Sequence, residues 1–124
     1  MQRDLDLIRV IALRIEEAKT AVDSSLIAVQ GHSNSDIGKH CALMVEAGLI
    51  DTINLTHLAS DFPGYRINGL TWKGHDFVDA ARNETTWNKA LVKVKTQATG
   101  FTFAILLELL KQQVRESLGL PLGL

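Results

Sequence analysis

Apolar side chains recur every three or four positions between residues 4 and 22, which predicts an amphipathic helix with one face turned towards a core. Asp4 precedes the first of these apolar residues and is the predicted N-cap, since its carboxylate can accept a backbone N–H of the first turn. Residues 26–29 then form a continuous apolar run that stops before Gly31. A run of this length predicts a short buried strand.

A second helix is predicted between Ser33 and Gly48. Ser33 and Asp36 approximate a capping box, in which a serine hydroxyl accepts a backbone N–H three residues ahead. Gly48 follows the last apolar position, where a glycine commonly ends a helix. The apolar residues of this helix share one stripe: Ile37, Cys41, Met44 and Val45.

A β-hairpin is predicted next. Polar and apolar residues alternate over residues 49–58, and Ile53 and Leu55 share the parity that we expect to face the core. A Pro-Gly pair at residues 63–64 is the strongest turn signal in the chain. Residues 65–70 return as the second strand, so the two strands have the proportions of a wing.

Three further helices complete the predicted order of elements. Thr71 is the expected N-cap of the first, and Trp72 is expected to pack that helix against the hairpin. Thr85 or Thr86 is expected to cap the second, and the third spans residues 101–118. The pattern therefore predicts an α+β fold that is mostly helical.

Two phrases resemble parts of winged-helix domains. Residues 40–50 (HCALMVEAGLI) resemble their third helix, and residues 70–78 (LTWKGHDFV) resemble the segment that leaves their wing. The resemblance implies a winged helix (helix, short strand, helix and β-hairpin wing) with three additional C-terminal helices. It places a winged-helix core in residues 1–82 and a helical extension in residues 83–124, within a single structural domain.

A narrower resemblance covers nearly the whole chain. The opening run of residues 3–9, the phrases at 70–77 and 85–89, and the close at 116–120 are similar to a family of uncharacterised winged-helix-like proteins of bacteria, prophages and mobile elements. The family is a domain of unknown function, so the resemblance implies a fold more than an activity. The second helix of the usual helix-turn-helix is absent or very short between residues 29 and 33.

Composition narrows the classes of function. The chain has 124 residues, of which 46% are hydrophobic and 22% charged, and its single cysteine, Cys41, excludes an internal disulfide framework. The four histidines show no ligand spacing, and no catalytic constellation is visible, so we expect no metal, no cofactor and no enzyme. The chain lacks an apolar run of about eighteen residues, and its charged N-terminus is unlike a secretory signal. We therefore expect a cytoplasmic protein without a membrane segment.

DNA binding is the leading hypothesis for function, because a winged helix places its recognition helix in the major groove. The net charge of −1 gives no general attraction to DNA, and residues 31–60 hold one lysine against three acidic residues. The alternative is a protein-interaction module, an accessory or inhibitor protein, that keeps the fold without binding DNA. The expected DNA contacts are Asn34, Ser35 and Lys39, beside the exposed Gly38 and Ala42, with Tyr65 and Arg66 on the wing.

The last helix is apolar on most of its circumference, as expected of a helix that is covered on most sides. We therefore expect a homodimer in which Phe101, Ile105 and Leu109 form the interface. Lys89 and Lys93 share a face of the preceding helix and are interpreted as a solvated face, with an accessory phosphate contact as the alternative.

Overall fold

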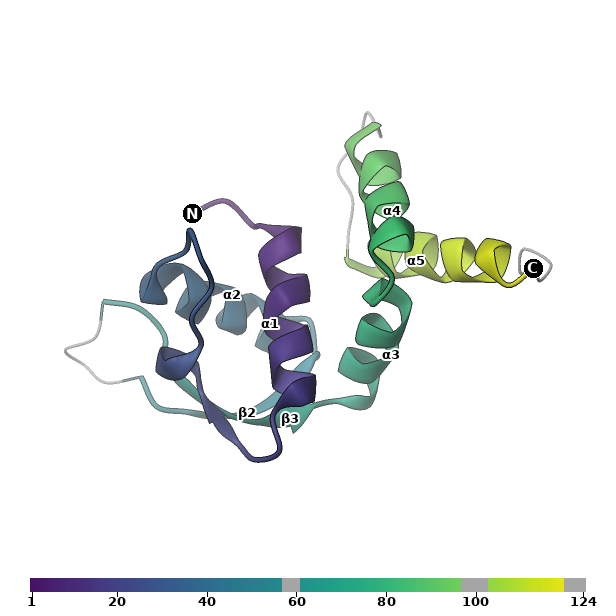
Figure 1. Ribbon diagram of the computed structural model, residues 1–124. Coiled ribbons are helices and arrows are strands. Elements are labelled where there is room, and N and C mark those ends of the chain that lie inside the picture. The colour runs from purple at the N-terminus through teal and green to yellow at the C-terminus, as the bar shows by residue number, and fades with distance from the viewer. Residues whose placement is uncertain (57–60, 97–102, 120–124) are drawn as a thin grey trace. The chain divides into compact units, whose positions relative to one another are not determined.

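The computed structural model describes residues 1–56, 61–96 and 103–119. Over these residues the fold is α+β and mostly helical, with five α-helices and a three-stranded antiparallel sheet (Figure 1). This confirms the predicted fold class in its general form. The chain divides into two compact units, Met1–Asp76 and Phe77–Leu124, and the division falls within helix α3 (Trp72–Ala81).

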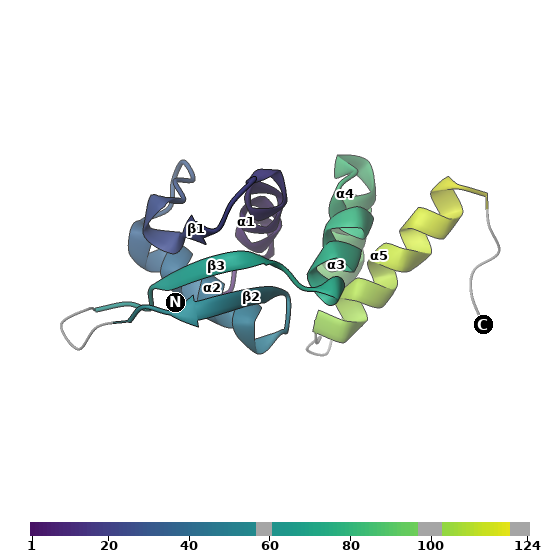
Figure 2. The same cartoon turned by 90° about the horizontal axis from the view of Figure 1, so that it is seen from below.

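The first unit is built around a sheet in the order β1-β3-β2, so that β3 is the central strand. Helices α1 and α2 contact each other, and they contact β3 and β2 respectively. Both helices lie on the same face of the sheet (Figures 1 and 2). The elements of this unit, before α3, are α1 (Leu5–Glu17), β1 (Val22–Asp23), the 3₁₀ helix η1 (Ser24–Leu26), α2 (Asn34–Glu46), β2 (Ile50–Asn54) and β3 (Tyr65–Leu70).

Helix α1 begins where the sequence predicted. The Asp4 carboxylate accepts the backbone N–H of Leu7 at 3.2 Å, which confirms Asp4 as the N-cap. The helix is shorter than predicted, because Val22 leaves the helical pattern and pairs with Ile67 in the sheet. The core face of α1 consists of Leu7, Ile8, Ile11, Ala12 and Ile15.

The strand predicted over residues 26–29 is wrong: the strand lies earlier, at β1, and η1 follows it directly. Asp23 drives this turn, because its carboxylate accepts both the backbone N–H of Ser25 at 2.9 Å and its hydroxyl at 2.7 Å. The same two hydrogen bonds, the backbone one first, lower the pKa of Asp23. Leu26 is 79% exposed, so the apolar run is not a buried strand.

Both predicted ends of α2 are confirmed. The Ser33 hydroxyl accepts the backbone N–H of Asp36 at 3.1 Å, as an N-cap does. Gly48 lies just past the helix with φ +75°, a conformation that glycine adopts at little cost. The helix buries Ile37, Cys41 and Met44, which form the predicted stripe, while Val45 is exposed.

The hairpin forms as predicted, but the expected burial of its first strand is wrong. Ile53 and Leu55 are 53% and 37% exposed, whereas Ile50 is buried. The pairing of β2 with β3 shifts register between Asp51 and Thr52. Because an irregularity of this kind changes which parity of the strand faces the core, the alternation pattern pointed to the wrong side.

Helix α3 begins at the predicted cap. The Thr71 hydroxyl accepts the backbone N–H of Gly74 at 3.1 Å and donates to the carbonyl of Gly48, which ties the helix start to the end of α2. Trp72 is 86% exposed, so the expectation that it packs the helix against the hairpin is wrong. Only the side chains that follow later in α3 are buried, Phe77 and Val78 among them.

The second unit contains the end of α3, α4 (Glu84–Thr96) and α5 (Phe103–Ser117), and α4 contacts α5. Trp87 is buried and meets the ring of Phe77 edge-on, with centroids 5.9 Å apart. The expected caps of α4, Thr85 or Thr86, are wrong. The Asn83 side chain accepts the backbone N–H of Thr86 at 3.0 Å, so Asn83 is the N-cap and both threonines lie inside the helix. On α5, the core is formed by Leu106, Leu107 and Leu110.

No helix among the described residues is both long and apolar enough to cross a bilayer.

Candidate functional site

Helix α2 carries most of the residues that the sequence singled out. Asn34 is exposed at the first position of the helix, and Ser35 and Lys39 are half-buried beside it. Ser35 and Lys39 are four residues apart and therefore lie on one side of the helix. The structure thus leaves three of the five predicted contact residues accessible along the N-terminal half of α2.

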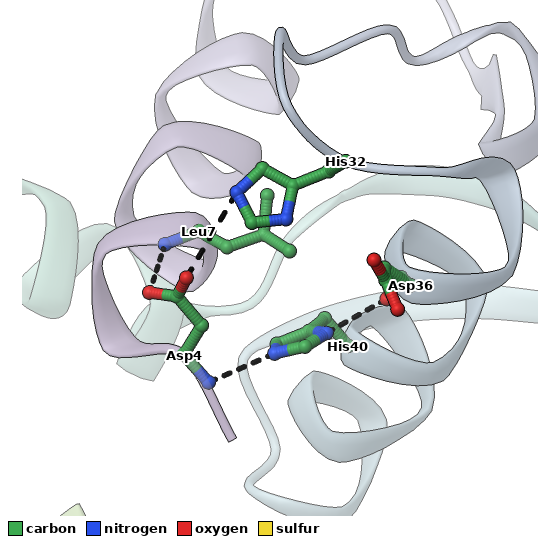
Figure 3. Close-up of polar contacts among 5 residues, drawn as sticks. All are labelled: Asp4, Leu7, His32, Asp36 and His40. Atoms are coloured by element: carbon green, nitrogen blue, oxygen red, sulfur yellow. Dashed lines mark hydrogen bonds and ion pairs between the residues drawn. The ribbon is translucent and has the colours of Figure 1, made fainter. Parts of the chain in front are cut away.

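A polar network fixes the start of α2 against the start of α1 (Figure 3). The buried ring of His40 accepts the backbone N–H of Asp4 through Nε2 at 2.9 Å. Because Nε2 is the acceptor, the proton of the neutral ring lies on Nδ1, which donates to the carbonyl of Asp36 at 2.7 Å. The Asp4 carboxylate caps α1 and lies 3.8 Å from Nε2 of His32. The N-terminal half of α2 is therefore held in place by hydrogen bonds as well as by apolar packing.

Gly38 occupies a position on α2 that no larger residue could take without a shift. A Cβ atom at this glycine would collide with the carbonyl of Pro63 and press against the ring of Phe62. Gly38 is buried, so the expectation that it lies on the exposed side of α2 is wrong. Phe62 and Pro63 therefore lie directly on α2.

The two predicted contacts on the hairpin point in opposite directions. Tyr65 is only 9% exposed, and its burial, followed by the charges of Cys41 and Glu46, raises its pKa. These neighbours belong to α2, so the Tyr65 ring faces the helices. Arg66 is the next residue on the strand and is exposed, so it lies on the opposite face of the sheet. The structure therefore does not bring Tyr65 and Arg66 to one surface with α2.

The outer face of the hairpin, consisting of Ile53, Leu55 and Arg66, was not predicted. Ile53 pairs with Arg66 across the two strands, so their side chains leave the sheet on the same side. Leu55 lies two residues beyond Ile53 and shares that side. Exposed aliphatic residues around an arginine are typical of protein interfaces. The alternation of residues 49–58 contained this stripe but pointed to the wrong face of the sheet.

Charge on and around α2 is mixed. The helix carries one lysine, Lys39, against Asp36 and Glu46. Lys39 makes no ion pair with any described residue, so its ammonium is available to an anion. Within the described parts of the chain, no group of three or more His, Cys, Asp or Glu residues is placed to hold a metal ion.

The expected dimer residues lie on α5. Ile105 is 42% exposed and Leu109 is half-buried, on a side of the helix away from its buried leucines. Phe101 lies outside the described residues.

Comparison with known proteins places the chain in a family. Residues 2–101 match the family model "Hypothetical protein (DUF2513)". The chain is also similar to an "Uncharacterized protein" of Haemophilus influenzae (strain ATCC 51907 / DSM 11121 / KW20 / Rd), with 34% identity over 99 residues, covering 79% of this chain and 82% of that protein. No solved structure matches the chain. The resemblance to an uncharacterised family is therefore confirmed, and the chain belongs to the family "Hypothetical protein (DUF2513)".

Proposed function

We propose that this chain is a small winged-helix DNA-binding protein, a regulator of the phage or mobile-element type. The observation that carries the proposal is the order of elements in the first unit: helix, strand, 3₁₀ turn, helix, and two strands with the last strand central in the sheet. In a winged helix, α2 would be the recognition helix and the β2–β3 hairpin the wing. The short η1 would replace the second helix of a helix-turn-helix.

The contact surface in this proposal is the N-terminal half of α2. Asn34 can pair with an adenine edge, Ser35 can donate to a phosphate, and Lys39 supplies the positive charge. The network of Asp4 and His40 supports this role, because it holds the helix start that would face the DNA. Tyr65 and Arg66 are left out, since one is buried and the other lies on the far face of the sheet.

Three charge-reversing variants test this surface by fluorescence anisotropy with a mixed-sequence duplex at low salt. Lys39→Glu should weaken binding about tenfold, because it replaces a phosphate contact by a repulsion. Lys19→Glu is the matched control, because Lys19 is an exposed lysine of the same unit and lies outside α2. This variant should change the affinity less than about twofold. Arg66→Glu should resemble the control. Equal affinities for all three variants would contradict the assignment of α2.

The outer face of the hairpin favours a second function, a protein-interaction module that does not bind DNA. Ile53 and Leu55 would form the apolar centre of the contact, and Arg66 would supply a positive charge beside it. In this second proposal, Ile53→Asp would abolish partner binding and Lys39→Glu would not. The same pair of variants therefore separates the two functions.

A further inference from the structure

We infer that the second unit carries a binding groove for small organic carboxylates with an apolar part, a site separate from the proposed DNA surface. The groove lies between α4 and α5 and has a volume of about 550 Å³. This size is within the range of small-molecule sites. The groove is lined by Thr85, Asn88, Lys89, Val92, Lys93, Gln113 and Glu116.

The cation of Lys93 is held in place before any ligand binds. With the Gln113 amide turned so that its oxygen faces α4, Lys93 Nζ donates to that oxygen at 2.7 Å. The Gln113 amide nitrogen then donates to the Glu116 carboxylate at 3.3 Å. Gln113 is only 3% exposed, so its position is fixed by the helix packing. An ammonium has three donors, and two remain on Lys93 for an anion.

Lys89 supplies a second charge one helical turn away. Residues four apart on a helix are neighbours, so the two ammonium groups can reach the same ligand. Within the described part of the chain Lys89 makes no ion pair. Glu116 is the one acidic lining residue, so the lining as a whole carries a net positive charge.

Val92 indicates that the ligand has an apolar part. This valine is 60% exposed and lines the same groove as the two lysines. An apolar side chain beside charged groups suits a small-molecule site, in which apolar contact gives affinity and a few polar groups give orientation. The ligand class is therefore a carboxylate joined to an apolar group, rather than a bare inorganic anion.

The inference is tested with phenylacetate and its uncharged isostere phenylacetamide, by following amide chemical shifts of the full chain in two-dimensional NMR spectra. Phenylacetate should give saturable shifts at the groove residues with a Kd on the order of 1 mM, as expected for exposed charges and a small apolar contact. Phenylacetamide should give little or no shift. Equal shifts with both compounds, or none with phenylacetate, would overturn the inference.

Three exposed positions supply matched variants. Lys89→Gln should raise the Kd for phenylacetate about threefold to fivefold, since it removes one charge from the site. Glu116→Gln should lower the Kd about twofold, because it removes the opposing charge and keeps an acceptor for Gln113. Lys95→Gln changes an exposed lysine of the same helix that does not line the groove, and it should leave the Kd unchanged. If Lys89→Gln and Lys95→Gln behave alike, the site is not the one inferred.

Discussion

His40 shows how a single neutral side chain can position a whole helix. The ring is almost fully buried and accepts a hydrogen bond from the backbone N–H of Asp4, 36 residues away in the sequence. The second bond, to the carbonyl of Asp36, fixes the tautomer that accepts from Asp4. The bond to Asp4 depends on the approach of α1 to α2. Local sequence carries no information about such an approach.

Cys41 makes stability depend on pH in the alkaline range. Burial raises the pKa of its thiol to about 12, well above that of the unfolded chain. Above about pH 9 the unfolded chain loses this proton and the folded chain keeps it, so the free energy of unfolding falls as pH rises. The slope should approach about 1.4 kcal/mol per pH unit. Urea unfolding between about pH 8 and pH 10 measures it.

Cys41→Ala is the control for this slope, because it removes the titrating group at a small cost in packing. The variant should be less stable than the natural chain at about pH 8, and its stability should fall less steeply with pH. The range stays at or below about pH 10, where the raised pKa of Tyr65 contributes little. Parallel curves for the two proteins would contradict a buried, protonated thiol.

Secondary-structure elements that are decided locally could be predicted, and those decided by tertiary pairing could not. Asp4, Ser33 and Thr71 were identified as caps because a cap needs only the backbone N–H groups two or three residues ahead. The burial of Ile53 was predicted wrongly, because the register shift that decides it arises where β2 meets β3. The strand over residues 26–29 was wrong for a similar reason, since β1 forms only by pairing with β3.

The site was predicted in part. Asn34, Ser35 and Lys39 are accessible on α2, as an exposed helix face implied. Tyr65 and Arg66 separate because neighbouring strand residues point to opposite faces, and only the structure shows which face the helices cover. The exposed Trp72 was expected to be packed, because a tryptophan side chain is highly buried on average and the sequence gives no sign that this one is left outside.

The contact between the hairpin turn and α2 depends on the absence of a side chain at Gly38. Gly38→Ala would place a Cβ against the Pro63 carbonyl, and the turn would have to move. Alanine favours a helix by up to about 1 kcal/mol over glycine, yet the collision with backbone should outweigh this gain. We expect a net loss of about 1–2 kcal/mol in the free energy of unfolding.

Gly69→Ala is the matched control, because nothing lies within 4 Å of a Cβ built at that position. Its stability should stay within about 0.5 kcal/mol of the natural chain. Urea unfolding of both variants measures the difference. A Gly38→Ala protein as stable as the Gly69→Ala protein would show that Phe62 and Pro63 do not rest on α2.

For the molecule as a whole, a net charge of −1 and one lysine on α2 make weak DNA binding the expectation for a single copy. Two copies would present two such helices, and closed two-fold dimers are the commonest oligomers. The exposed side of α5 at Ile105 and Leu109 is the surface that we propose for this contact. In this proposal, dimerisation strengthens DNA binding because each copy contributes one α2 helix.

Light scattering after size exclusion tests the dimer. The natural chain should have twice the mass of 13.6 kDa, and Ile105→Asp with Leu109→Asp should yield the monomer, because a buried charge at the contact is costly. Leu26→Asp, at an exposed apolar residue on η1, should leave the dimer intact. A double variant that remains dimeric would place the interface elsewhere.

The most direct test of DNA binding is the anisotropy of a labelled mixed-sequence duplex, measured over a series of salt concentrations. Because few phosphates can be neutralised by one lysine in each of two copies, log K should fall with log salt at a slope of about −2. Binding at low salt with this shallow slope is the predicted result. A folded protein that shows no binding at about 100 μM in low salt, the weak limit of non-specific affinity, would contradict the proposal.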